Sequence, residues 1–139
     1  MRIRPFRSED TDAVVELWEV TGLTRPWNDP RKDIARKLSV QPQLFVVAED
    51  EEGIVLGCIM AGYDGHRGWM NYLATTPDAR GTGIGRALVD HVELELRELG
   101  CPKLSLQVRT SNAEVVEFYR HLGYETDDTV TLGKRLIVD

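Results

Sequence analysis

Apolar positions in the first 75 residues alternate between helical and strand spacing. Residues 8–10 are typical of a helix start, and the helical spacing of the apolar residues that follow predicts a helix with Ala13, Val14, Leu17 and Trp18 on one face. An aspartate N-cap before proline at 29–30 predicts a second short helix, with Ile34 and Leu38 as its apolar face. Short apolar runs predict strands at 3–5, 44–48, 54–61 and 69–75, and turns at 49–53 and 63–68 join the last three.

The second half of the chain predicts a crossover from strand to helix to strand. Residues 83–99 carry one apolar stripe and end at Gly100, which is typical of a helix C-terminus. Alternation over 104–108 predicts a strand, a helix follows over 112–122 with Gly123 after it, and Val130, Leu132 and Leu136 predict the last strands. The fold class is therefore α/β, with a mixed, mostly antiparallel sheet of six to seven strands and about four helices in a single domain over residues 1–139.

Amino-acid composition excludes fewer classes of function than the pattern of apolar and polar positions does. The net charge of −6 disfavours nucleic-acid binding, because phosphate contacts need a basic surface. No apolar run is long enough to cross a membrane and the first residues lack the apolar core of a signal peptide, so we expect a cytoplasmic protein with no membrane partner. Cys58 and Cys101 are far apart and form no C-x-x-C pair, so we expect two reduced thiols and no metal.

The segment Arg80-Gly-Thr-Gly-Ile-Gly-Arg86 lies between a predicted strand and the longest predicted helix. Glycines let a backbone approach an anion closely, and the first amides of a helix lack partners of their own. The helix dipole and the two arginines add positive potential, so a diphosphate fits here. A P-loop lysine is absent and Arg86 stands where a dinucleotide fingerprint has glycine, so an ATP or NAD site fits poorly. A glycine turn without any ligand remains an alternative.

The pattern Arg80-x-x-Gly83-x-Gly85, preceded by residues 73–77 and followed by an amphipathic helix, resembles the acetyl-CoA loop of the GNAT superfamily of N-acetyltransferases. Residues 106–112 and 118–124 are similar to the second conserved block of that superfamily. Residues 25–30 and 62–68 look most similar to the small bacterial YpeA acetyltransferases. The resemblance implies the GNAT fold and transfer of an acetyl group from acetyl-CoA to a primary amine, of a peptide N-terminus or a small molecule, by direct attack in a ternary complex.

The resemblance also implies roles for individual residues. It predicts a bulge in the strand at 69–75 and pairing of the pantetheine arm with the backbone of Leu73 and Thr75, while a backbone N–H near Ala74 would hold the oxyanion. Asn112 would bind the pantetheine arm, or serve only as a helix N-cap, and Tyr119 would protonate the leaving thiolate, or only pack in the core. The cofactor-binding set is Leu73, Ala74, Thr75, Arg80, Gly81, Thr82, Gly83, Ile84, Gly85, Arg86, Asn112 and Tyr119.

The general base is left open by the sequence. Similar ribosomal-protein alanine acetyltransferases have glutamate where this chain has Gln107, and an amide cannot accept the proton. An α-amine loses its proton more easily than lysine and needs such a base less. A water relay, Asp64 or His66 are the alternatives, and either side chain could simply be solvated.

Acceptor binding is expected from the first two helices and the neighbouring turns, with Trp18, Trp27, Trp69, Asn71, Asp64 and His66 as candidates; His91 and His121 are taken as helix residues without a role. The tryptophans could also serve packing alone. A non-catalytic acetyl-CoA sensor on the same fold is the competing reading. The sequence leaves open whether the protein is a monomer or a homodimer.

Overall fold

The computed structural model describes all residues from Met1 to Asp139 and divides them into two compact units. The first unit comprises residues 1–106 together with Asp139, and the second comprises residues 107–138. The expectation of a single domain over 1–139 stays a prediction. No helix of the chain is both long enough and apolar enough to span a membrane.

The first unit is built on one mixed sheet whose strands follow each other in chain order. The strands are β1 (Arg2–Pro5), β2 (Phe45–Glu49), β3 (Val55–Tyr63), β4 (Gly68–Thr75) and β5 (Leu104–Ser105). Neighbours from β1 to β4 are antiparallel, whereas β5 is parallel to β4, as the predicted crossover requires. The antiparallel first half and the crossover in the second half are therefore confirmed.

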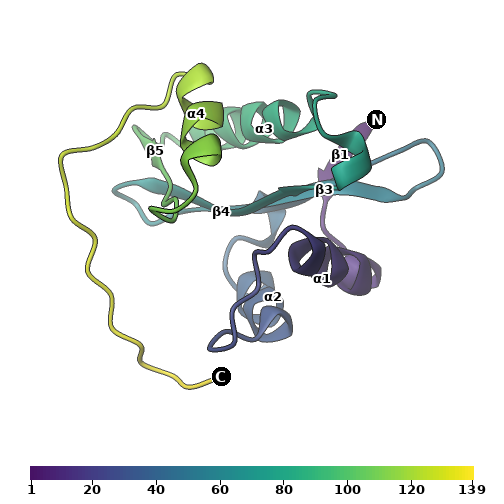
Figure 1. Ribbon diagram of the computed structural model, residues 1–139, viewed down its shortest axis with the longest axis horizontal. Coiled ribbons are helices and arrows are strands. Elements are labelled where there is room, and N and C mark those ends of the chain that lie inside the picture. Colours follow the sequence, from purple (N-terminus) through teal and green to yellow (C-terminus); the bar gives the residue numbers. More distant parts are fainter. The chain divides into compact units, whose positions relative to one another are not determined.

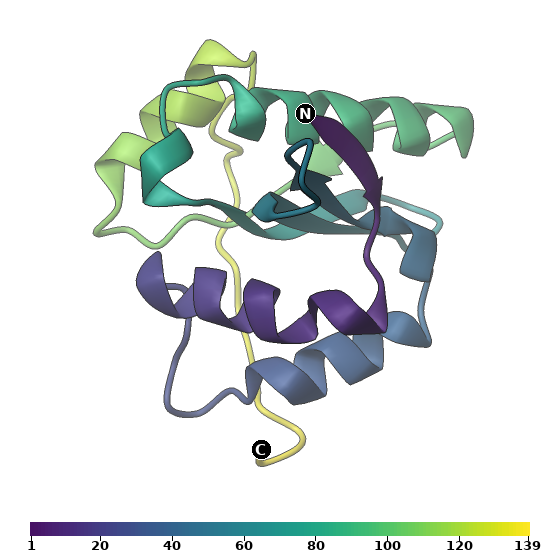
Figure 2. The ribbon, with the colours of Figure 1, turned by 90° about the vertical axis from the view of Figure 1, so that its right-hand side faces the viewer.

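Helices cover both faces of this sheet. Figures 1 and 2 show α1 (Thr11–Val20) and α2 (Pro30–Leu38) on one face and α3 (Ile84–Glu98) on the opposite face. Strand side chains alternate between the faces, so Phe45 and Val47 of β2 pack with α1 in one apolar cluster. Three short 3₁₀ turns, Ser8–Asp10, Pro42–Leu44 and Pro77–Ala79, connect the elements.

The second helix begins where the sequence predicts and differs in which side chains it buries. The Asp29 carboxylate accepts hydrogen bonds from the amides of Arg31 and Lys32, which confirms the predicted N-cap. Ile34 is buried as expected, but Leu38 is exposed. Lys37, three residues after Ile34 on the same side of the helix, is buried instead, and its Nζ donates to the carbonyl of Ala61 in β3.

A buried ion cluster joins the first strand to the first helix and to β2. The guanidinium of Arg4 donates to both carboxylate oxygens of Asp10, at 2.8 and 2.9 Å, and to Glu49 at 2.9 Å. Burial alone would raise the pKa of Asp10, but the hydrogen bonds from Arg4 and from the Arg7 amide outweigh it and lower that pKa. Asp10 therefore stays ionised in the folded protein.

The second unit contains the helix α4 (Ala113–His121), which ends as predicted with Gly123 at a φ of +95°. The expected final strands are wrong: no strand follows β5, and Val130, Leu132 and Leu136 are exposed. The sheet therefore has five strands and not six to seven, and β5 covers two residues where five were predicted. Alternating apolar residues favour a strand only where a neighbouring strand supplies hydrogen bonds, and this requirement is not visible in the sequence.

Candidate active site

A β-bulge interrupts the pairing of β4 with β3. Cys58 faces Ala74 and Met60 faces Asn71, so two residues of β4, Tyr72 and Leu73, stand opposite one residue of β3. Tyr72 has a φ of +55°, a left-handed conformation that is uncommon for a residue with a side chain. The bulge that the resemblance implies is therefore present, and it places Asn71 and Tyr72 on the same side of the sheet, the side covered by α1.

Beyond the bulge, the outer edge of β4 carries unpaired backbone groups. β5 pairs with only Gly68 and Trp69, so no strand accompanies β4 from Met70 to Thr75. The amide of Thr76 donates to the carbonyl of Leu56 at 2.8 Å. Backbone hydrogen-bonding groups alternate in direction along an antiparallel strand. The N–H and C=O of Ala74 therefore also point to β3, and those of Thr75 point to the outer edge. An extended ligand can therefore hydrogen-bond to this edge as an added strand does.

The glycine segment opens α3 without any cap from a side chain. Gly83 is the N-cap residue with a φ of +86°, and Gly81 has a φ of +78°. The first hydrogen bond of the helix runs from Ala87 to the Gly83 carbonyl at 3.0 Å. The amides of Ile84, Gly85 and Arg86 therefore find no acceptor within the helix or in a capping side chain. These three amides and the positive end of the helix dipole all face the space in front of the first turn of α3.

Close packing sets the start of α3 beside the end of β4. Gly57 of β3 pairs with Thr75. A Cβ at Gly57 would lie 3.1 Å from a methyl of Ile84 and 3.1 Å from a methyl of Leu88, both in α3. The structure thus brings the uncapped amides of α3 and the outward backbone groups of Thr75 to the same end of the first unit.

Positive side chains flank the glycine segment. Arg80 and Arg86 are both exposed, and the nearest carboxylate to Arg86, that of Asp90, is 4.0 Å away. Thr82 is exposed and its hydroxyl donates to the carbonyl of Ala79. The two guanidinium groups are therefore available to an incoming anion.

The predicted acceptor residues divide into exposed and buried members. Trp27, Trp69 and Asn71 are exposed, and Asn71 and Trp69 lie on the α1 side of β4, as the pairing with Met60 and Gly62 indicates. Trp18 is completely buried and its ring stacks on that of Tyr72 with centroids 3.9 Å apart. Trp18 therefore has a packing role and does not contact an acceptor.

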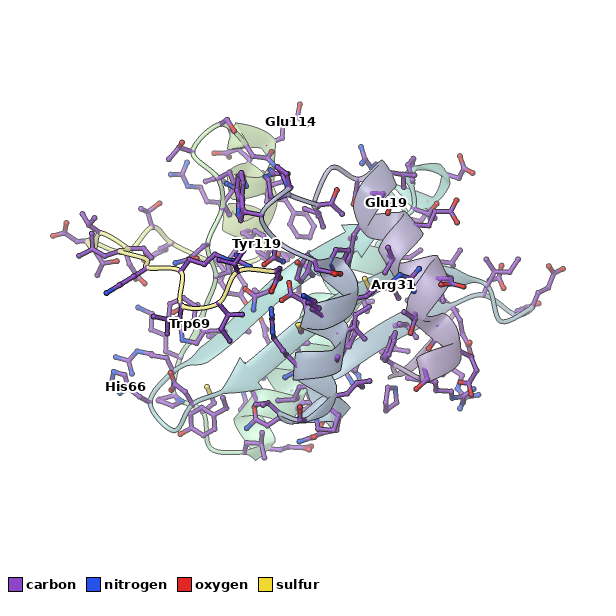
Figure 3. All side chains as sticks on the ribbon, turned by 90° about the horizontal axis from the view of Figure 1, so that it is seen from below. Glu19, Arg31, His66, Trp69, Glu114 and Tyr119 are labelled. Carbon is purple, nitrogen blue, oxygen red and sulfur yellow. The ribbon has the colours of Figure 1, made fainter.

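Asp64 and His66 lie in the exposed turn between β3 and β4. Figure 3 labels His66 in this turn. The Asp64 carboxylate accepts from the amides of His66 and Arg67 at 2.8 and 2.7 Å, and these hydrogen bonds lower its pKa. From Gly68 to Thr75 the strand spans about 23 Å, at about 3.3 Å per residue. The structure therefore does not bring this turn together with the glycine segment, and the lowered pKa makes Asp64 a weak base.

A polar network beside the bulge was not anticipated from the sequence. The hydroxyl of Tyr72 donates to the Asp33 carboxylate at 2.6 Å and accepts from the Asn28 side chain at 3.0 Å. Arg36 donates to the other Asp33 oxygen at 3.1 Å. Burial and the neighbouring Asp33 raise the pKa of Tyr72, so its phenol stays protonated. The sequence does not indicate this contact, because Asn28 and Asp33 are 44 and 39 positions from Tyr72 along the chain.

Asn112 and Tyr119 belong to the second unit. Asn112 is the N-cap residue of α4, but its side chain makes no capping hydrogen bond, so the structure gives no support to a role as a simple cap. The ring of Tyr119 contacts Phe118 and Tyr124 edge to face, and burial raises its pKa. Gln107 is exposed, and His121 bonds the Glu117 carbonyl within its own helix. In the first unit, His91 lies on α3, 3.9 Å from Glu95.

Both cysteines are free thiols, and burial raises the pKa of Cys58 to about 12. No group of three or more His, Cys, Asp or Glu side chains is arranged to hold a metal ion.

Comparison with known proteins places this arrangement in a family. A family model described as the acetyltransferase (GNAT) family matches residues 11–124. A Yersinia pestis (strain Pestoides F) protein named acetyltransferase is 52% identical over 139 residues, which are 100% of this chain and 98% of that protein. The structure of Ard1 from Thermoplasma volcanium is 29% identical with a TM-score of 0.76, covering 88% of this chain and 80% of Ard1.

A further solved structure, Chaetomium thermophilum Naa20 in complex with a bisubstrate analogue, is 25% identical with a TM-score of 0.72 and covers 88% of this chain and 70% of that chain. The chain therefore belongs to the GNAT family of acetyltransferases, has the GNAT fold and is an acyltransferase enzyme. The predicted family and fold are confirmed, and the narrower similarity to the YpeA group stays a prediction.

Proposed function

We propose that this enzyme transfers the acetyl group of acetyl-CoA to a primary amine, either the α-amine of a protein or peptide or an amine of a small molecule. The observation that carries the proposal is the uncapped start of α3 beside the unpaired edge of β4. A diphosphate is an anion of the size that three helix amides and two arginines accommodate. An extended amide-containing arm suits the outward N–H and C=O of Thr75.

The proposed reaction is direct attack by the neutral amine on the thioester while both substrates are bound. Naa20, which is similar in fold, binds a bisubstrate analogue, and this supports a ternary complex. The alternation of β4 favours the outward amide of Thr75 as the oxyanion donor, since Ala74 faces β3. Tyr119 is the proposed acid for the leaving thiolate, and its raised pKa keeps it protonated at neutral pH.

The exposed Trp27, Trp69 and Asn71 are the proposed acceptor contacts, while Asn112 is the proposed partner of the pantetheine arm. An α-amine with a pKa near 8 loses its proton at neutral pH at a cost of about 1 kcal/mol, whereas a lysine side chain needs about 4.6 kcal/mol. We therefore favour α-amines and other amines of low pKa as acceptors.

Two measurements on the full chain test the proposal. Thermal unfolding with CoA, acetyl-CoA, ATP or NAD should show stabilisation by the first two ligands only, because a ligand that binds only the folded state raises the midpoint. Release of free CoA thiol is then measured with acetyl-CoA and a panel of peptides, polyamines and small amines. Stabilisation by ATP or NAD alone contradicts the proposal. Tight binding of acetyl-CoA without thiol release from any amine favours the sensor reading instead.

A further inference from the structure

The Asn28–Asp33–Tyr72 network has features that core packing does not require. Tyr72 packs its ring on Trp18 and directs its hydroxyl to Asp33, at the position where β4 bulges. The Asp33 side chain keeps 21% of its surface exposed, so solvent and small groups reach it. Asn71, the residue before Tyr72, is exposed on the same side of the sheet. A polar network thus opens beside the bulge on the side that α1 and α2 cover.

The groups around Asp33 come from α2, β4 and α1, and also from Asn28 and Asp139. Within α2, Arg36 donates to Asp33 and also pairs with the carboxylate of Asp139. Lys32 of the same helix donates to the main-chain oxygen of Asp139 at 3.1 Å. β4 contributes the Tyr72 hydroxyl, and α1 presents the ring of Trp18, with no charged side chain of α1 in contact with Asp33. One Asp33 oxygen thus accepts from Arg36, and the other accepts from both the Tyr72 hydroxyl and the Asn28 side chain.

The hydrogen-bond directions in this network define a path for a proton. The Tyr72 hydroxyl donates to Asp33, so its oxygen keeps a lone pair to accept from another donor. Asn28 supplies one such donor at 3.0 Å, and a phenol oxygen has room for a second. A further donor to the Tyr72 oxygen would therefore bind a phenol already hydrogen-bonded to a carboxylate.

We propose that Tyr72 contacts the acceptor amine and that Asp33 receives the amine proton through the Tyr72 hydroxyl. This inference rests on the proposed acetyl transfer, and it supplies the proton acceptor that Gln107 cannot be. Tyr72 is then a catalytic residue, while Asp33 acts through it and Asn28 orients the phenol. Arg36 fixes the orientation of the Asp33 carboxylate through its hydrogen bond.

The proton transfers balance in one turnover. The amine nitrogen forms a bond to the thioester carbon, and the positively charged nitrogen gives a proton to the Tyr72 oxygen while the Tyr72 proton passes to Asp33. As the carbonyl re-forms, the carbon–sulfur bond breaks; the thiolate takes a proton from Tyr119, and Tyr119 takes a proton back from solvent. Asp33 then releases its proton to solvent. An amide and a free thiol are the products, and no oxidant or other reactant is needed.

The test compares Asp33→Asn and Tyr72→Phe with wild type in the thiol-release assay, with the amine that gives the fastest release. We expect each variant to lower kcat about 100-fold, the range for loss of a proton-transfer group, with KM for acetyl-CoA within about twofold of wild type. Wild-type kcat should reach a plateau once the amine is neutral. In Asp33→Asn it should keep rising with pH, because hydroxide must then take the proton.

The matched control is Asp12→Asn. Asp12 is an exposed aspartate that also pairs with an arginine, Arg31, at 2.8 Å, so the charge change is the same. This control should keep wild-type kcat and pH profile. Tyr72→Phe keeps the ring that stacks on Trp18, so it remains informative where Asp33→Asn fails to fold.

The outcomes separate the two proposals. If wild type releases no thiol, the proposed function fails and this inference fails with it. If wild type turns over and either variant keeps its kcat and its plateau, the relay is wrong and acetyl transfer stands. A rise in the KM for the amine alone, with kcat unchanged, assigns the network to amine binding and refutes the proton path.

Discussion

Replacement of Gly83 by alanine tests whether the start of α3 is a ligand site or only a turn. Gly83 has a φ of +86°, so Gly83→Ala places a side chain in a left-handed conformation at a cost of about 1–2 kcal/mol. A Cβ there would meet no protein atom within 4 Å, so no steric clash is added. For a chain of this length we expect the unfolding midpoint to fall by about 4 °C per kcal/mol.

Gly100→Ala is the matched control because Gly100 follows the other end of α3 with a φ of +83° and also has no atom near its Cβ position. Both variants should lose the same stability in a thermal scan without ligand. Only Gly83→Ala should weaken CoA binding in calorimetry, about tenfold or more, because relaxation of φ turns the amides of Ile84 and Gly85 away from their common direction. An equal CoA affinity for Gly83→Ala and wild type would refute the assignment of the diphosphate site.

Three further predictions concern other parts of the chain. Asp10→Asn should lower the free energy of unfolding by about 3 kcal/mol at pH 7, because it leaves the buried Arg4 without its main partner. Since the folded pKa of Asp10 is lowered, the stability that wild type gains from this carboxylate is present above about pH 4 and is lost as pH falls through the folded pKa. The urea midpoints of wild type and Asp10→Asn should therefore converge in acid. Gly57→Ala should cost about 2 kcal/mol in urea unfolding, because its Cβ would stand 2.9 Å from the Ala74 carbonyl, and an unchanged midpoint would contradict this packing. Tyr119→Phe should lower kcat about 100-fold with little change in the KM for acetyl-CoA, and an unchanged kcat would show that Tyr119 is not the acid.

Much of the candidate site could be read from the sequence because its parts are local. The positive φ of Gly81 and Gly83 and the uncapped amides of α3 follow from glycines just before an amphipathic stripe. The N-cap at Asp29 is equally local, since its side chain bonds amides two and three residues later. Interactions over so few residues depend little on the rest of the fold.

Other features depend on neighbours that are distant in sequence. Trp18 looked like a possible pocket residue, but the stack on Tyr72 buries it completely. Leu38 fitted a helical stripe, but the sheet meets α2 at Lys37. The alternation near Val130 predicts a strand, and no strand forms there. In each case the partner surface decides which side chain is buried, and spacing along one segment carries no information about that surface.

The sequence by itself determined the element order up to α4, the family, and the uncapped start of α3 after the glycine segment, because periodicity and turn residues act over a few positions. Only the tertiary structure decided where in β4 the bulge falls, that the outer edge of β4 is unpaired beyond Trp69, and that Asp33 meets the Tyr72 hydroxyl. These features depend on register and on contacts between residues far apart in the chain, so they exist only once the sheet and helices have packed.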